Sequence, residues 1–214
     1  MAHAQTVDIA RFVDPVTVRS VSISPSGAYV AYIRRGAAGE EIVVVDLAAN
    51  STRTIESVRR THGLFNWVAW KGDDHVLAGV EAFMTGEIRR PMGSNLPQRG
   101  RDYSVHRVVS ISRDGSGFVQ MFEGQLHRLA WGFGSTQLLD ALPNDPGHVL
   151  LIASDNFGIG VWRADIATGR AERVADGTWD TRSYATDGAG HPVMRFDALA
   201  DRSGYRVMRR ASGA

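Results

Sequence analysis

The residues of this chain best suited to bind a ligand lie in one glycine- and proline-containing segment, Met84–His106. The segment holds four arginines and a tyrosine: Arg89, Arg90, Arg99, Arg101 and Tyr103. A guanidinium presents a fork of N–H donors that matches the two oxygens of a carboxylate. Long loops also carry binding residues more often than the scaffold beneath them. We therefore predict that these five residues contact substrate carboxylates or a neighbouring domain. The alternative is a solvated loop or an extended β-hairpin arm.

Catalytic and metal-binding motifs are not found in the sequence. There is no G-x-S-x-G nucleophile elbow, and the nearest string, Asp114–Gly117, is typical of a turn between two strands. The H-E-x-x-H, P-loop and Rossmann glycine patterns do not occur either. The seven histidines share no ligand spacing, and four aspartates sit in turns, where bonds to the local backbone favour Asp. We therefore predict no catalytic residue, no metal site and no cofactor in this chain.

Composition narrows the class of protein. The 214 residues are 43% hydrophobic and 22% charged, as in a globular domain. No apolar run approaches the ~20 residues that span a bilayer. The net charge of +1 gives no reason to expect a nucleic acid as partner. Lys71 is the only lysine, and this arginine bias is typical of a GC-rich genome. The absence of cysteine excludes disulfides and thiolate metal sites.

The first residues bear on the compartment. Ala2-His3-Ala4 has the small-x-small form of a signal-peptidase cleavage site, but no apolar segment precedes it. A start at an internal Met of a longer gene would account for this, and a chance alanine-rich start is the alternative. The compartment therefore stays open between cytoplasmic and periplasmic or secreted, with a slight preference for the latter.

The elements that must position any site follow a repeat. Four times, an apolar run breaks at a Gly/Asp/Pro turn and resumes as a second apolar run. The turns are Ser24–Gly27, Lys71–Asp74, Asn144–Gly147 and Thr186–Gly190. A supersecondary unit that recurs every ~40 to 50 residues indicates a β-propeller. The spacing between the second and third turns is wider than the other two. It fits this period if the second unit carries the insertion Met84–His106.

We therefore predict an all-β fold, a partial β-propeller of about three and a half four-stranded antiparallel blades. A short N-terminal helix, Thr6–Val13, would precede them within a lead-in over residues 1–17. The propeller itself would occupy residues 18–214. Its blades would span approximately residues 18–56, 65–123 with the insertion 84–106, 137–175 and 180–214. An all-β sandwich, which also has short strands and regular turns, is the alternative fold.

Two tryptophans test this reading of the strands. Trp67 and Trp70 lie three residues apart in a predicted strand, so they should face opposite sides of the sheet. We expect the tryptophans to pack between blades, with a sugar-binding aromatic ring as the alternative.

Several segments resemble a known family. The stretch Ile9–Pro15, followed by Val21–Tyr32, resembles the amino-terminal start of prolyl oligopeptidase-family serine peptidases, with their short helix and "lSPdGk.vaf" hairpin. Val108–Ser116 and Asp165–Gly169 resemble the "vnvDGs" hairpin and the "vDl.TG" turn of that family. Ser26 stands where the family usually has Asp. TolB-type bacterial propellers share the turn motifs, so these identify the fold more firmly than the family.

The resemblance implies a function. Such peptidases have an amino-terminal propeller of seven or eight blades and a carboxy-terminal α/β-hydrolase domain with catalytic Ser, Asp and His. The resemblance covers nearly this whole chain but only about half of such a propeller. No position in this chain matches the family's catalytic residues. We expect a non-catalytic part that gates and orients peptide substrates for a hydrolase domain of the parent chain.

Two alternatives remain at this point. The first is a TolB-type or WD-repeat-like propeller that acts as a protein-binding scaffold. The second is a ring completed by two copies of this chain, because a partial propeller exposes blade faces and strand edges that favour self-association.

Overall fold

The computed structural model describes residues 17–36, 38–84, 103–130 and 134–209, and the structural statements below concern these residues. They form fifteen β-strands and one 3₁₀ turn, η2 (Leu126–Arg128). In chain order the strands are β1 (Val18–Ile23), β2 (Tyr29–Arg35), β3 (Gly39–Asp46), β4 (Ser51–Arg59), β5 (Gly63–Lys71), β6 (His75–Met84), β7 (Tyr103–Ser112), β8 (Phe118–Gln120), β9 (Thr136–Asp140), β10 (His148–Asp155), β11 (Gly158–Asp165), β12 (Ala171–Ala175), β13 (Thr181–Thr186), β14 (Pro192–Ala198) and β15 (Tyr205–Arg209).

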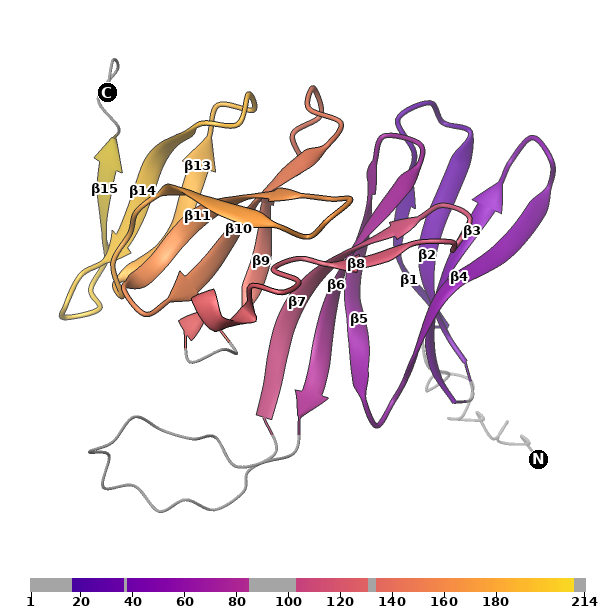
Figure 1. The fold of residues 1–214 in the computed structure, drawn as a ribbon, viewed down its shortest axis with the longest axis horizontal. Coiled ribbons are helices and arrows are strands. Elements are labelled where there is room, and N and C mark those ends of the chain that lie inside the picture. The colour runs from indigo at the N-terminus through magenta and orange to yellow at the C-terminus, as the bar shows by residue number, and fades with distance from the viewer. Residues whose placement is uncertain (1–16, 37, 85–102, 131–133, 210–214) are drawn as a thin grey trace, which may run out of the picture.

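The strands group into four antiparallel sheets in which each strand pairs with the next along the chain. The sheets are β1–β4, β5–β8, β9–β12 and β13–β15, and we call them blades one to four. Figure 1 shows the blades side by side in chain order, from blade one on the right to blade four on the left. Such radially repeated meanders form β-propellers. The open row of four blades therefore confirms the predicted partial β-propeller. The predicted helix Thr6–Val13 lies outside the described residues.

Three hydrophobic clusters hold successive blades together. Phe65 of blade two is 2% exposed and packs in the first cluster, against blade one. Trp162 of blade three is also 2% exposed and packs in the second cluster, against blade two. The third and smallest cluster joins Tyr184 of blade four to blade three. Each blade therefore buries a sheet face by packing against its neighbour, as expected for a repeat that cannot form a core alone.

One strand, β5, serves two of these clusters. Trp70 belongs to the first cluster and Trp67 packs against the second, so the predicted opposite orientation of the two tryptophans is confirmed. A β-bulge between Phe65 and Trp67 shifts the pairing of β5 with β6 by one residue. Because side chains alternate along a strand, Phe65 would otherwise share the side of Trp67. The bulge instead places Phe65 with Val68 and Trp70 in the first cluster.

Polar contacts join the repeated turns of successive blades. The backbone N–H of Ser26, in the first turn, donates to Oδ1 of Asp73 in the second at 3.1 Å. At the other end of the row, the Thr186 hydroxyl donates to the Asp140 carboxylate of blade three. The turns that revealed the repeat therefore also link the blades.

Lys71 makes the strongest of these links, between the second and third turns. The residue is 4% exposed. Its Nζ donates to the main-chain carbonyl oxygens of Ala141, Leu142 and Asp145, at 2.7 Å in the case of Leu142. Burial lowers the pKa of the Lys71 ammonium, and the Asp145 carboxylate acts in the opposite direction. The three carbonyl groups replace the water that a buried charge would lose.

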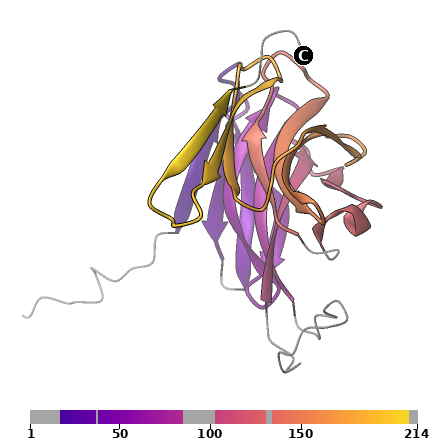
Figure 2. The ribbon, with the colours of Figure 1, turned by 90° about the vertical axis from the view of Figure 1, so that its left-hand side faces the viewer.

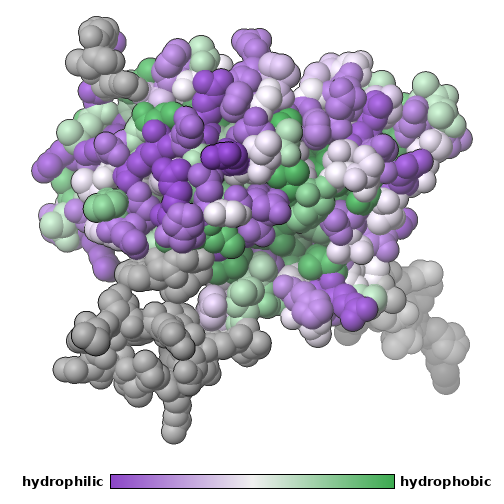
Figure 3. Space-filling view, viewed as in Figure 1, coloured by the Kyte–Doolittle hydropathy of each residue, from purple (hydrophilic) through white to green (hydrophobic). Residues whose placement is uncertain are grey.

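One predicted strand is shorter than expected. The sequence predicts a strand over Phe118–Phe122, but β8 ends at Gln120 and pairs only with residues Val109–Ile111. Met121 still donates its backbone N–H to the Val108 carbonyl oxygen at 3.0 Å, but Phe122 has a positive φ of 65° and donates instead to the Gly169 carbonyl oxygen. Both side chains are fully buried in the second cluster. Most of the outer edge of β7 is therefore not covered by β8. In Figure 3, hydrophobic surface gathers in this middle part of the molecule, whereas the surface over blades three and four is largely hydrophilic.

The two end blades each leave one apolar sheet face without a described partner. On blade one, Val21 and Ile23 are 62% and 65% exposed, on the side of β1 away from the first cluster. On blade four, Tyr205 and Val207 are 64% and 56% exposed, and Val207 pairs with Phe196. Figure 2 shows blade four facing the viewer with no described element in front of it. Exposed apolar patches of this kind are typical of interaction surfaces.

We expect the isolated chain to self-associate through these two faces. Val21→Lys and Val207→Lys each place a charge on one face without touching a buried cluster. Each should weaken association by about tenfold or more, since burial of one valine is worth roughly 1.5–3 kcal/mol. Ala48→Lys, in the exposed β3–β4 turn, is the matched control. Sedimentation velocity over a concentration series measures the effect, and a wild-type chain that stays monomeric throughout would rule out self-association.

Candidate functional site

A cleft of about 480 Å³ lies at the junction of blades two and three and reaches the start of blade four. Its walls come from β5, β6 and β7 on one side and from β9, β10, β11 and β13 on the other. The lining residues are Asn66, Trp67, Gly79, Val80, His106, Arg107, Val108, Ser135, Thr136, Gln137, Ile152, Ala153, Ser154, Ile159, Thr181 and Arg182. Such a volume fits a short peptide segment or another small ligand, and polar groups on an otherwise apolar wall are typical of binding sites.

The start of β9 forms one wall of the cleft, and side chains there accept hydrogen bonds from the edge of β7 that β8 does not cover. Because β8 is short, the backbone N–H groups of His106 and Val108 have no strand partner and need other acceptors. The Ser135 hydroxyl accepts from the His106 N–H at 3.4 Å, and Thr136 Oγ1 accepts from the Val108 N–H at 3.1 Å. Side-chain hydroxyls of blade three thus accept hydrogen bonds from backbone N–H groups of β7 that no strand partner satisfies.

Arg107 is the buried cation of this wall. The residue is 6% exposed, and Nη1 donates to the carbonyl oxygens of Gly134 at 2.7 Å and His106 at 3.0 Å. No salt bridge joins Arg107 to a carboxylate among the described residues. Burial lowers the pKa of the guanidinium, and Tyr103 on the same strand acts in the opposite direction. The group remains charged because the arginine pKa lies far above neutral.

Trp67 forms the floor of the cleft by lying against a glycine. A Cβ atom on Gly79 would come within 2.2 Å of Trp67 Nε1, closer than any real contact. Near the same wall, Asn66 Nδ2 lies 3.4 Å from His106 Nδ1. Gly79 therefore sets the position of the indole between the two blades.

The predicted site residues fall differently in the structure. Arg89, Arg90, Arg99 and Arg101 lie outside the described residues. Tyr103 begins β7, where it pairs with Met84 at the end of β6. The predicted insertion 84–106 therefore contributes its last four residues to a strand, and β6 and β7 are joined by residues 85–102. His106, the last residue of the predicted segment, does line the cleft.

Sequence reasoning missed Arg107, Arg182 and Asn66. Each lies in an ordinary strand pattern, and nothing in its local sequence distinguishes it from a structural residue. Only the pairing of blade two with blade three brings them to one cleft.

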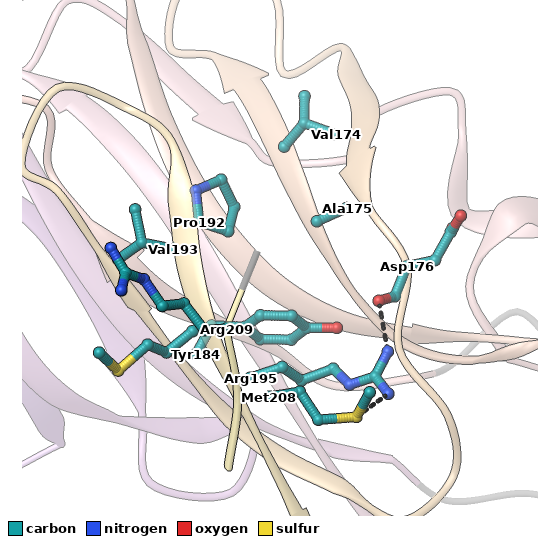
Figure 4. A pocket seen from close by; sticks show the side chains of 10 residues that line it. Val174, Ala175, Asp176, Tyr184, Pro192, Val193, Arg195, Met208 and Arg209 are labelled. Carbon is teal, nitrogen blue, oxygen red and sulfur yellow. Dashed lines mark hydrogen bonds between the residues drawn. The ribbon is translucent and has the colours of Figure 1, made fainter. Parts of the chain in front are cut away.

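A second pocket of about 360 Å³ separates blades three and four. Figure 4 shows Tyr184 and Arg195 within it. Arg195 is already neutralised, because Nη2 lies 2.9 Å from Asp197 Oδ2, and its Nη1 donates to the Asp176 carbonyl oxygen at 3.1 Å. Burial raises the pKa of the Tyr184 phenol to about 12, so it is protonated at neutral pH. Two charged residues that line this pocket, Asp176 and Arg195, are therefore already paired, with Arg173 and Asp197 respectively.

Catalytic geometry is not evident at the contacts that come nearest to it. Ser110 Oγ lies 3.4 Å from His75 Nδ1, but Ser110 is 2% exposed and lies within the sheet. Within the described residues, no group of three or more His, Cys, Asp or Glu side chains could hold a metal ion. Among the same residues, no helix has the length and apolar character needed to cross a membrane.

Comparisons with known proteins give structural but not sequence matches. No protein-family model matches the chain, and a search of curated proteins finds no match. TolB from Acinetobacter baumannii is similar over 89% of this chain and 40% of its own, with 14% identity and a TM-score of 0.51. That likeness shows the β-propeller fold.

Peptidases are also among the similar structures. An acylaminoacyl peptidase in complex with Z-Gly-Gly-Phe-chloromethyl ketone covers 84% of this chain and 28% of its own, with 13% identity and a TM-score of 0.49. The uncomplexed Pyrococcus horikoshii acylaminoacyl peptidase covers 89% and 32%, with 12% identity and a TM-score of 0.47. The chain thus spans less than half the length of each of these three proteins.

Substitution of Gly79 tests the architecture of the cleft. Gly79→Ala should displace the Trp67 indole and lower the free energy of unfolding by about 1–3 kcal/mol, the usual cost of overpacking. Gly36→Ala is the matched control, because its Cβ would meet its nearest neighbours at an ordinary 3.6 Å. Urea denaturation measures both. Equal stability of the two variants would show that Trp67 does not pack on Gly79.

Proposed function

We propose that this chain is the propeller part of a prolyl oligopeptidase-type serine peptidase. In this proposal it binds and orients peptide substrates for a hydrolase domain of the parent protein. The observation that carries the proposal is the cleft between blades two and three, which combines an aromatic floor with hydroxyl, amide and guanidinium groups. These groups suit the alternating polar backbone and apolar side chains of a peptide.

The sequence motifs that resemble the peptidase family support this proposal, because they adopt the turns that the family pattern requires. In the Asp165–Gly169 turn, Asp165 Oδ1 accepts hydrogen bonds from the backbone N–H groups of Ala167 at 2.9 Å and Thr168 at 2.8 Å. Gly169 follows with a positive φ of 70°. The Ser24–Gly27 turn ends likewise in a glycine, with a φ of 75° at Gly27.

The location of the cleft also fits this role. It is lined by Gly79 and Val80 of β6 and by His106–Val108 of β7, and His106 lies three residues after Tyr103, where β7 begins. We propose that Arg89, Arg90, Arg99, Arg101 and Tyr103 add further contacts to a bound peptide. The hydrolase domain would supply the nucleophile and its base.

The uncovered faces of blades one and four also bear on the proposed role. We propose that further blades of the parent protein cover them in the assembled enzyme. Genomic sequence beyond this reading frame provides a test. Helix–strand alternation containing G-x-S-x-G would support the peptidase assignment, and further blades followed by a stop codon would contradict it.

A protein-binding scaffold of the TolB type is the second candidate function, favoured by the fold likeness to TolB. The two differ in their ligand. A substrate-orienting propeller should bind short, extended peptides, whereas a scaffold should bind a folded protein and ignore such peptides.

Peptide binding tests the proposed function directly. Fluorescence anisotropy of short fluorescein-labelled peptides should show saturable binding to the 214-residue protein without cleavage. His106→Ala should weaken binding by roughly 3- to 10-fold through loss of a polar contact. His127→Ala, an exposed histidine on η2, should have no effect. Absence of saturable binding would refute the proposal. Cleavage abolished by a serine-directed inhibitor would refute its non-catalytic part.

A further inference from the structure

The charge of the cleft differs from that of the chain as a whole. The chain carries 24 basic and 23 acidic residues, almost in balance. The residues that line the cleft include two arginines, Arg107 and Arg182, and one histidine, His106, but no aspartate or glutamate. A concave site with charges of one sign concentrates ligands of the opposite sign.

Six of the seventeen arginines that the structure describes are paired with carboxylates. Nη2 of Arg19 lies 2.7 Å from Glu40 Oε1, and Nη2 of Arg34 lies 2.5 Å from Glu41 Oε2. Further pairs are Arg113 with Asp74, Arg163 with Asp145, Arg173 with Asp155 and Arg195 with Asp197. The other eleven described arginines form no salt bridge with a described residue, and Arg107 is the only one of the seventeen that is buried.

The two cleft arginines are among the eleven without a described carboxylate partner. Arg107 is buried, yet its recorded acceptors are two main-chain carbonyl oxygens. The exposed Arg182 likewise donates from Nη1 to carbonyl oxygens, those of Trp179 at 2.9 Å and Thr181 at 3.1 Å. Neither forms a salt bridge within the described residues. Carbonyl groups satisfy hydrogen bonds but leave a full positive charge uncompensated, which is costly for a buried group.

We propose that the cleft binds a carboxylate group of its peptide ligand, with Arg107 and Arg182 as the cations that recognise it. This inference rests on the proposed function and names the class of peptide that the site prefers. A carboxylate supplies the charge that the two arginines lack and can accept two parallel N–H···O bonds from one guanidinium. The hydroxyl groups of Ser135 and Ser154, which also line the cleft, offer further donors to its oxygens.

The carboxylate could come from the carboxy terminus of a peptide or from an acidic side chain. Four unlabelled probes distinguish these sources by competition in the anisotropy assay. The first pair is acetyl-Ala-Tyr-Ala as free acid and as amide. The second pair is the amides of acetyl-Ala-Glu-Ala and acetyl-Ala-Gln-Ala. We expect the charged member of at least one pair to bind about ten- to a hundredfold more tightly than its neutral partner, as for a charge-assisted hydrogen bond.

Variants assign the preference to the two arginines. Arg107→Gln should reduce the ratio between charged and neutral probes to near one while the neutral probes still bind. Since Arg107 is buried and its loss could impair folding, the exposed Arg182→Gln provides a second test, with a reduction of about threefold or more expected. Arg206→Gln, on the exposed strand β15, is the matched control and should leave the ratio unchanged.

The outcomes separate this inference from the proposed function. Equal binding of charged and neutral probes would overturn the carboxylate preference and leave peptide binding intact. A preference that survives both Arg107→Gln and Arg182→Gln would place the carboxylate elsewhere and overturn the assignment. If no probe binds, both the inference and the proposed function fail.

Discussion

A blade of this protein has two apolar faces and can bury neither of them alone. The rest of the structure depends on this constraint. Blades two and three have a neighbour on both sides, and residues such as Phe65 and Trp162 are buried at the junctions. Blades one and four have one described neighbour each, so Val21 and Val207 remain exposed. The two outer faces therefore have the character of surfaces that another sheet covers.

The same constraint produces the cleft. Over most of each junction, a neighbouring sheet packs directly against the blade through apolar side chains. At the junction of blades two and three, β8 stops early and the start of β9 approaches the free edge of β7 through hydroxyl groups. Hydroxyl groups rather than apolar side chains line this part of the junction, and they can hydrogen-bond both to β7 and to a ligand. Lys71 links the same two blades at their repeated turns, where its Nζ donates to the Leu142 carbonyl oxygen of blade three.

The sequence predicted the scaffold far better than the site. Strands β1 and β13 begin and end where alternation and turn residues place them, because each is bounded by Gly, Pro or Asp turns. Strand β8 ends early because Phe122 turns away from β7 with a positive φ of 65° and is buried between blades, a tertiary effect that no local pattern contains. Arg107 and Arg182 are 75 residues apart, and their meeting depends on blade packing. The predicted arginines of the insertion lie outside the described residues, and Tyr103, the fifth predicted residue, lies on β7, the strand that also carries His106 and Arg107.

Hydrogen–deuterium exchange on the 214-residue protein, with and without a saturating acetylated peptide that has a free carboxylate, tests the central claim most directly. That claim is that the cleft between blades two and three is the binding surface of this propeller. The account predicts slower exchange on peptide addition in β7 near His106, at the start of β9 near Ser135 and at the start of β13. Unchanged exchange in these strands, or protection confined to the repeated turns at the opposite end, would contradict it.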